Sequence, residues 1–360
     1  MNISQIHVRK DQLTEATKAE IVGGDLAEGA VRLKVESFSV TANNITYAVV
    51  GDGFGYWNFF PAADGHGIVP MWGHAQVIES NSEEIAVGER VYGYLPMASH
   101  LDVIPGKVSS GGFTDMTDYR QPMSPIYNQY SRLASDPEHD PARENERMIF
   151  GPLFKTGFLI EYFMRSDDWF GAEQVILTSA SSKTAMGLAS VAKQSSPSIK
   201  RIGLTSASNC DFVESTGLYD VVISYEEIGT LPIADSVSVD FAGNATVLAK
   251  LHDHFSDTLK YSCLVGATHI EERGTFGGPD NLAGPKPVLF FAPDHAVAFF
   301  KEHGPAEGGK QVAGSWHGFL GAVEGTVEMV ELSGLESARS TYLEMLGGEV
   351  DPAKGIVVRP

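Results

Sequence analysis

The chain of 360 residues contains only two cysteines, Cys210 and Cys263. Two cysteines cannot form a disulfide framework or a zinc site of four thiolates, so we expect a cytoplasmic protein that works in a reducing compartment. No run approaches the roughly 18 consecutive apolar residues of a membrane-spanning helix. The first ten residues, MNISQIHVRK, also lack the apolar core of a signal peptide. We therefore expect no membrane partner.

Positive charge is scarce as well. Lysine and arginine number 26 against 46 acidic residues, which gives a net charge of −20. Such a surface repels phosphate backbones and anionic lipid, so nucleic acid is excluded as a partner and a small molecule is expected instead. A hydrophobic content of 43% over this length is enough for two domains with substantial cores.

Glycine is mostly missing from the one loop where it would be expected. Residues 175–187 read VILTSASSKTAMG, and a second apolar segment, RIGLTS, follows at 201–206. A strand, a polar loop, a small-residue helix and a second strand form the first half of a dinucleotide-binding fold. A pyrophosphate would lie at the helix N-terminus, where N–H groups and the helix dipole attract anions. The candidate ligands are Ser179, Ser181, Ser182, Lys183 and Thr184.

Two other interpretations of this loop exist. Serine and threonine are common helix N-caps, so the same residues are compatible with an ordinary helix start. The triplet Ser182-Lys183-Thr184 also imitates the end of a nucleotide triphosphatase P-loop, with Asp240 as its acidic partner. That motif requires glycine where this chain has Leu177 and Ser182, which argues against it.

The end of the second strand predicts which dinucleotide binds. In NAD-specific folds an acidic residue there holds the ribose 2′-hydroxyl. Here the candidate residues are Thr205, Ser206 and Asn209, and no acid occurs before Asp211. Hydroxyl and amide groups accommodate a 2′-phosphate that a carboxylate would repel, so we expect NADP(H) as the cofactor.

The pattern of apolar and polar residues before position 175 indicates a separate N-terminal domain. Residues 30–40 alternate apolar and polar side chains, and short strands continue to about residue 105, which indicates a β-rich domain. The segment 111–150 is polar and has no clear period, and residues 136–146 are expected to form a solvated surface. Pro152 is expected to open an apolar helix over 153–164.

From residue 175 strands and helices alternate, which implies a parallel sheet. The expected strands are 175–179, 201–205, 221–225, 236–241, 260–266 and 287–291. Ser333 and Glu336 have the spacing of a capping box for a helix that ends at Gly347-Gly348, and a final strand follows at 355–358.

This order of parts resembles the medium-chain dehydrogenase/reductase superfamily, and particularly its zinc-independent quinone and enoyl reductases. The segments that carry the resemblance are residues 71–80 with 87–91, 239–243 and 264–268. More specific strings, at 41–47, 55–61, 127–130 and 179–184, resemble a bacterial family known only as a domain of unknown function. The resemblance implies an α/β fold with a GroES-like domain over 1–150, joined by 325–360, and a Rossmann domain with a doubly wound parallel sheet over 151–324.

The same resemblance implies a set of site residues. Gly266, Ala267, Thr268 and Thr156 match the positions around the nicotinamide. Tyr56 is the nearest match to the proton-donating tyrosine of the enoyl reductases, and Tyr47 and Asn44 are expected to face the substrate from the end of a strand. The aromatic residues around Tyr56 are equally typical of a packed core.

No metal is expected. The zinc-dependent members have a cysteine within the stretch that is Ser39 to Asn43 here, and a Gly-His-Glu where this chain has Gly73-His74-Ala75. We expect a homodimeric, metal-independent NADPH-dependent reductase of a small α,β-unsaturated carbonyl or quinone. The alternatives are a non-redox lyase that contains NADP and a non-catalytic NADPH-binding protein.

Overall fold

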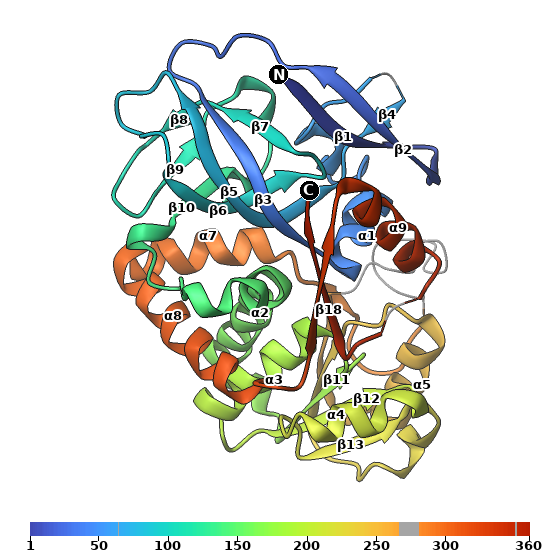
Figure 1. The fold of residues 1–360 in the computed structure, drawn as a ribbon. Coiled ribbons are helices and arrows are strands. Elements are labelled where there is room, and N and C mark those ends of the chain that lie inside the picture. Colours follow the sequence, from blue (N-terminus) through green and yellow to red (C-terminus); the bar gives the residue numbers. More distant parts are fainter. Residues whose placement is uncertain (64, 266–280, 350) are drawn as a thin grey trace. The chain divides into compact units, whose positions relative to one another are not determined.

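The computed structural model describes residues 1–63, 65–265, 281–349 and 351–360. They form two compact units (Figure 1), one of Met1–Ile149 with Glu328–Pro360 and one of Phe150–Val327, called unit 1 and unit 2 below. Within the described residues, no helix is long and apolar enough to cross a membrane.

Unit 1 is built from strands. They are β1 (Asn2–Arg9), β2 (Gln12–Val22), β3 (Val31–Val40), β4 (His66–Gly67), β5 (Pro70–Ser80), β6 (Arg90–Pro96), β7 (His100–Val103), β8 (Pro105–Gly106), β9 (Gly112–Asp115), β10 (Gln129–Arg132), β17 (Glu328–Ser333) and β18 (Lys354–Arg359). The larger of its two sheets has the order β17-β18-β3-β5-β6-β10-β9-β8, with β7 paired to β3. Strand β18 therefore brings the C-terminus back beside β3.

Short helical pieces connect these strands. They are α1 (Ala42–Val49), α9 (Leu335–Leu346) and the 3-10 turns η1 (Tyr56–Asn58), η2 (Asp118–Arg120), η3 (Pro125–Asn128), η4 (Leu133–Ser135) and η5 (Pro141–Arg143). The expected capping box of α9 is wrong, because Gly334 with φ of 83° is the N-cap and the Ser333 carbonyl accepts from the Ser337 hydroxyl. The helix does end at Gly347, as predicted.

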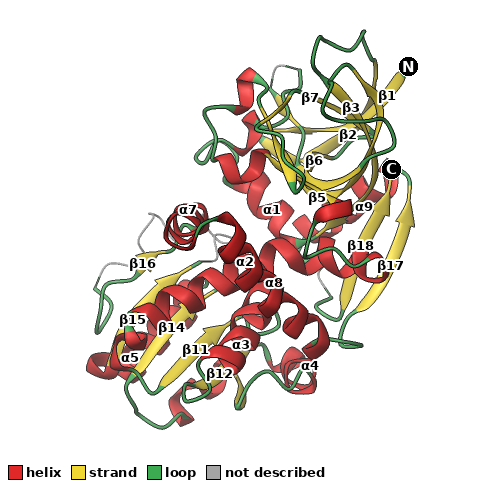
Figure 2. Ribbon diagram, turned by 90° about the vertical axis from the view of Figure 1, so that its left-hand side faces the viewer, coloured by secondary structure: helices red, strands yellow, loops and turns green. Residues whose placement is uncertain are grey.

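Unit 2 contains a parallel sheet with helices on both faces (Figure 2). Its elements are β11 (Gln174–Thr178), β12 (Lys200–Thr205), β13 (Val221–Ser224), β14 (Ser236–Asp240), β15 (Leu259–Leu264), β16 (Val288–Leu289), α3 (Lys183–Ser195), α4 (Cys210–Ser215), η8 (Tyr225–Thr230), α5 (Ala245–Phe255), α7 (Ala292–His303) and α8 (Pro305–Ala322). The strand order β13-β12-β11-β14-β15-β16 is that of a doubly wound fold, in which ligands bind beyond the carboxyl ends of the central strands. The predicted fold class is confirmed.

The core of unit 2 explains the near-continuous apolar strands. Ile176, Ile202 and Leu204 on the sheet pack with Leu251 and Phe255 of α5, and all five are buried. Parallel strands covered on both faces carry apolar residues throughout, and this is why their bounds could be predicted within one or two residues.

Helix α2 (Glu144–Ser166) differs from the prediction, because it begins eight residues before Pro152 instead of at it. Proline inside a helix leaves the carbonyl four residues earlier without its N–H donor. That carbonyl belongs to Met148, and the buried Ser39 hydroxyl donates to it at 2.8 Å. The tertiary contact therefore replaces the missing helical hydrogen bond.

The expectation of a solvated surface over residues 136–146 is also wrong in part. Asp136 and Arg147 form an ion pair at 2.5 Å whose side chains are only 5% and 3% exposed. His139 and Arg90 both bind Glu144, at 2.9 and 2.7 Å. The charges of this segment are therefore used in contacts within unit 1.

Candidate active site

The loop between β11 and α3 lies at the carboxyl end of a central strand of the parallel sheet, and it is called the phosphate loop below (residues 178–184). Ser179 has φ of 49°, a left-handed conformation for which glycine is favoured. Its N–H donates to the Tyr225 hydroxyl at 3.0 Å, and the Ala180 N–H donates to the Leu204 carbonyl at 3.0 Å. A serine therefore adopts the glycine conformation because hydrogen bonds from two neighbouring elements hold it.

A buried network fixes the start of this loop. The Thr178 hydroxyl donates to Asp240 at 2.6 Å and accepts the Phe241 N–H at 3.0 Å. Asp240 also accepts the Ala242 N–H at 3.1 Å. In the P-loop interpretation Asp240 would bind magnesium. Here its carboxylate joins the ends of two strands instead, which argues against that interpretation.

The N-cap interpretation is confirmed for one residue of the loop. Ser182 is the N-cap of α3, and its hydroxyl accepts the Ala185 N–H at 3.2 Å. The N–H groups of Ser181 and Thr184 donate to no acceptor within the described residues. Because α3 is 13 residues long, its N-terminus keeps a partial positive charge beside these two donors. Capping and anion binding are therefore compatible here.

Close packing of α2 against α3 depends on two glycines. A Cβ added to Gly157 would lie 2.5 Å from the Leu188 N atom, and one added to Gly187 would lie 3.0 Å from the Phe154 Cα atom. Real Cβ atoms essentially never approach as closely as the first distance, and the second is tighter than nine in ten real Cβ contacts. The small residues that the sequence places after the loop are therefore required for this helix contact.

The predicted ligands for the ribose end lie at the end of β12. Ser206 and Asn209 are partly exposed, and the Asn209 amide donates to the Ser181 hydroxyl at 3.4 Å, so the structure brings this group to the phosphate loop. Thr205 is only 1% exposed and sits within the sheet, opposite Ser224. Burial, and then Glu227, Glu214 and Asp211, raise the pKa of the Cys210 thiol, so carboxylates surround this end of the site.

Of the four residues predicted around the nicotinamide, only Thr156 is among the described residues. Gly266, Ala267 and Thr268 lie outside the described residues. Thr156 lies in α2, where its hydroxyl donates to the Pro152 carbonyl at 3.3 Å.

Unit 1 contains an aromatic core that we call the tyrosine cluster, and its members come from four separate segments. They are Tyr47, Tyr56, Tyr94 and Tyr127. Ring centroids of Tyr47 and Tyr56 are 4.6 Å apart, and those of Tyr94 and Tyr127 are 4.8 Å apart. Burial raises the pKa of all four phenols, so each is protonated at neutral pH.

The hydroxyl groups of the cluster have different partners. Tyr47 Oη accepts the Asn43 amide at 2.7 Å and the Trp72 indole N–H at 3.1 Å. Both lone pairs of that oxygen are thus occupied, which leaves its own hydrogen for donation. Tyr56 Oη and Tyr127 Oη share a hydrogen bond of 3.0 Å. The sequence predicted Tyr47 and Tyr56 here, and the structure adds the other two tyrosines and Trp72.

Two sequence-based placements on this side need correction. Tyr47 and Asn44 are in helix α1, and the preceding strand ends at Val40. The Asn44 side chain accepts the Thr41 N–H at 2.6 Å and donates to the Pro70 carbonyl at 2.8 Å, and it is 2% exposed. Asn44 therefore caps α1 and ties it to β5, because Thr41 and Asn44 have the capping-box spacing.

The alternation of aromatic residues along β5 and β6 could have indicated Tyr94 and Trp72 from the sequence. Trp72 and His74 alternate along β5, and Tyr92 and Tyr94 alternate along β6. In the antiparallel register Trp72 is opposite Tyr94 and His74 is opposite Tyr92. Residues two apart lie on one face of a strand, so these four form a single aromatic face.

Arg120 secures the segment that carries Tyr127. It is fully buried and donates to Asp115 at 2.9 Å, to Asn128 at 3.0 Å and to the Tyr127 carbonyl at 2.7 Å. Tyr130 completes its surroundings and donates to the Tyr94 carbonyl at 2.6 Å. The long segment 111–150 thus closes over the aromatic face.

His74 lies at the other end of that face. It is fully buried, neither ring nitrogen has a hydrogen-bond partner within the described residues, and burial lowers its pKa to about 3. Its ring is 5.1 Å from that of Tyr92, over which the Arg147 guanidinium stacks at 4.2 Å. No group of three His, Cys, Asp or Glu residues suited to a metal occurs in the described ranges.

Comparisons with known proteins show which folds and which family the chain resembles. No curated protein matches by sequence. Among solved structures, CurA from Vibrio vulnificus in complex with NADPH superposes with a TM-score of 0.62 at 15% identity, covering 99% of this chain and 98% of that one. The quinone oxidoreductase from Coxiella burnetii gives 0.56 at 13% identity, and a mutant enoyl thioester reductase from Candida tropicalis gives 0.59 at 10%, each covering 100% of both chains.

These similarities show the fold, an α/β architecture with a β-rich unit and a parallel sheet, as the sequence predicted. A family model described as "Protein of unknown function (DUF2855)" matches residues 38–351. The chain is therefore a member of the DUF2855 family.

Proposed function

We propose that the protein is an NADPH-dependent, metal-independent reductase of a small α,β-unsaturated carbonyl or quinone. The observation that carries the proposal is the phosphate loop, where the N–H groups of Ser181 and Thr184 point from the start of α3 and have no acceptor within the described residues. Three of the similar structures are described as complexes with NADPH or NADP, which supports the choice of cofactor.

The residues of the loop fit a dinucleotide. Ser181 and Thr184 would donate to the pyrophosphate, and Lys183, the first residue of α3, would add a positive charge. Ser206 and Asn209 would donate to the 2′-phosphate. The surrounding carboxylates would repel that phosphate. The preference for NADPH would therefore depend on the hydrogen bonds from Ser206 and Asn209. When bound, NADPH supplies a hydride, and this chain's residues must orient the substrate and provide a proton.

The tyrosine cluster would provide the proton. Its hydrogen bonds favour Tyr47 over the Tyr56 that the sequence suggested, since Asn43 and Trp72 already donate to the Tyr47 oxygen. The Tyr56–Tyr127 pair uses one of its two hydroxyl protons internally and keeps the other. A neutral phenol in this apolar core can donate to the oxygen of a developing enolate or quinol.

Calorimetric titration of NADPH and NADH, followed by absorbance of NADPH with a panel of enones and quinones, tests the proposal. We expect NADPH to bind more tightly and to be consumed with at least one acceptor. Failure to bind either dinucleotide would contradict the proposal, and binding without consumption would favour the lyase or binding-protein alternatives. Ser206→Asp should weaken NADPH about tenfold through charge repulsion, because Ser206 is partly exposed at the end of β12.

A metal assay tests whether the proposed reductase works without a metal. Elemental analysis of the purified protein should find less than stoichiometric zinc, and a chelator should leave turnover unchanged. One equivalent of zinc would contradict a metal-independent mechanism and would point to His74.

A further inference from the structure

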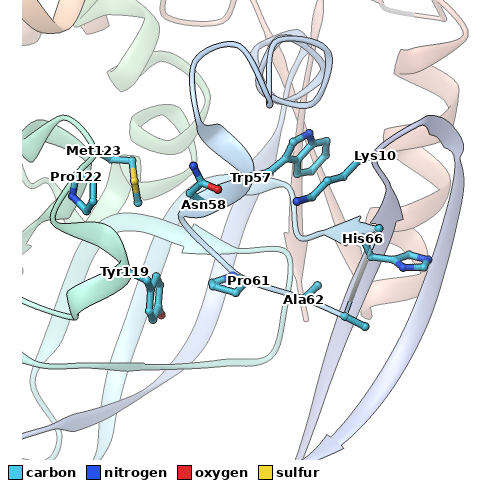
Figure 3. Close-up of a pocket in the computed structure, with 11 residues that line it drawn as sticks. Lys10, Trp57, Asn58, Pro61, Ala62, His66, Tyr119, Pro122 and Met123 are labelled. Carbon is cyan, nitrogen blue, oxygen red and sulfur yellow. The ribbon is translucent and has the colours of Figure 1, made fainter.

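Unit 1 contains a concave site, which we call the outer pocket. It has a volume of about 400 Å³ (Figure 3), within the range of small-molecule sites. Three parts of unit 1 form it: the turn between β1 and β2, the stretch from η1 to β4, and the region of η2. Its lining residues include Lys10, Trp57, Asn58, Pro61, Tyr119 and Met123.

The walls of the outer pocket are set by packing in the protein itself. Trp57 is 3% exposed and lies between two glycines, since a Cβ on Gly51 or Gly67 would approach its indole to 2.2 or 2.3 Å. The Lys10 N–H donates to the Gly65 carbonyl at 3.0 Å, and the Met123 N–H donates to the Arg120 carbonyl at 3.2 Å. A site built this way needs little ordering when a ligand enters.

One end of the outer pocket carries the ammonium group of Lys10. Figure 3 shows the Lys10 side chain extending toward Trp57 and Asn58. Lys10 is half-buried, and its ammonium has no hydrogen-bond or ion-pair partner within the described residues. The nearby carboxylates of Asp11 and Glu15 are both engaged by Arg9, at 2.7 and 3.0 Å. In a chain of net charge −20, a lysine without a partner at a concave site favours an anion there.

The other end is apolar. Pro122, Met123 and the Tyr119 ring line it, and Tyr119 is 41% exposed. A simple inorganic anion would leave this apolar surface in water. An occupant with a carboxylate at one end and a ring or short alkyl chain at the other would use both ends.

We propose that the outer pocket binds a small amphipathic carboxylate, with its anionic group on Lys10 and its apolar body between Trp57 and Tyr119. Two turns that line the pocket, η1 and η2, also carry Tyr56 and Arg120 of the tyrosine cluster and its support. The binding site is separate from the cofactor loop, so it does not depend on the proposed reductase activity.

The test is calorimetry on the full chain without any dinucleotide, with benzoate as the probe. Benzamide is the neutral isostere, and inorganic phosphate is the anion without an apolar body. We expect benzoate to bind, and benzamide and phosphate to bind at least tenfold more weakly. Absence of benzoate binding at about 10 mM, or equal binding of benzamide or phosphate, would overturn the proposal.

Variants then locate the site. Lys10→Met should weaken benzoate at least tenfold, and Tyr119→Ala should weaken it severalfold through the apolar end. The matched control is Lys18→Met on the neighbouring strand β2, where Lys18 pairs with Glu20 at 3.0 Å outside the pocket, and no change is expected. Circular dichroism checks the folding of each variant. Undiminished binding by both folded pocket variants would overturn the assignment.

Discussion

The phosphate loop of unit 2 and the tyrosine cluster of unit 1 hold their polar groups in different ways. In the loop, Thr178, Tyr225 and Asp240 fix the backbone, and other groups, the N–H donors of Ser181 and Thr184, have no acceptor within the described residues. In the cluster, the hydroxyls that would act on substrate also hold the cluster together. The free-energy effects of two substitutions in the loop should therefore add, whereas those of two substitutions in the cluster should not be additive.

The largest effect is expected from Arg120, which supports the cluster. Arg120→Met leaves Asp115 buried without its partner, and loss of one member of a buried ion pair costs about 3–5 kcal/mol of unfolding free energy. Urea denaturation measures it. The control is Arg132→Met, whose pair with Glu89 is partly exposed (24% and 23%) and should contribute below about 1 kcal/mol. Equal losses for both variants would show that the Arg120 network does not hold the cluster.

The second largest effect is expected on turnover, and it distinguishes Tyr47 from Tyr56 as the proton donor. Tyr47→Phe should lower turnover by roughly 10²-fold, about 2.7 kcal/mol in the activation barrier, with NADPH affinity unchanged. Tyr56→Phe should lower it less, and the double variant should lose less than the sum of the two because the hydroxyls share one network. Steady-state kinetics on a confirmed acceptor provides the measurement. A larger effect at Tyr56 would reverse the assignment, and full activity of both variants would move the proton source out of the cluster.

A substitution in the phosphate loop should affect cofactor binding instead of turnover. Lys183→Ala should raise the NADPH dissociation constant about tenfold, because it removes a positive charge at the start of α3. Lys193→Ala is the matched control, because Lys193 lies near the other end of α3 and donates to the Gly217 carbonyl. If Lys183→Ala binds NADPH as well as the wild type, the side chain does not contact the cofactor.

The smallest effect concerns acid stability of unit 1. The pKa of His74 is about 3 in the folded chain, below its usual 6.5, because burial disfavours the charged form. The unfolded chain therefore binds a proton first as pH falls below 6.5, and stability is lost between pH 6.5 and 3 at up to about 1.4 kcal/mol per pH unit. His74→Leu should flatten this slope in denaturation curves at pH 6.5 and 5.5. An unchanged slope would show that His74 does not dominate it.

Much of unit 2 could be predicted from the sequence because its signals are local. Each parallel strand is a short apolar run, and the strand β11, the loop and helix α3 follow one another directly in the chain. The start of helix α2 could not be predicted, since Pro152 is tolerated only through the distant hydroxyl of Ser39. The position of Asn44 was missed because a capping box was interpreted as the end of a strand.

The sequence by itself determined the class of fold, the place of the phosphate loop and its replacement of glycine by serine, because hydrophobic period and residue type act over a few neighbouring positions. Only the tertiary structure decided that Ser179 adopts a left-handed conformation under the Tyr225 hydroxyl. It also decided which tyrosines meet. Tyr47 and Tyr127 are 80 positions apart in the chain, and β5, β6 and the buried Arg120 bring them together through contacts that no local pattern records.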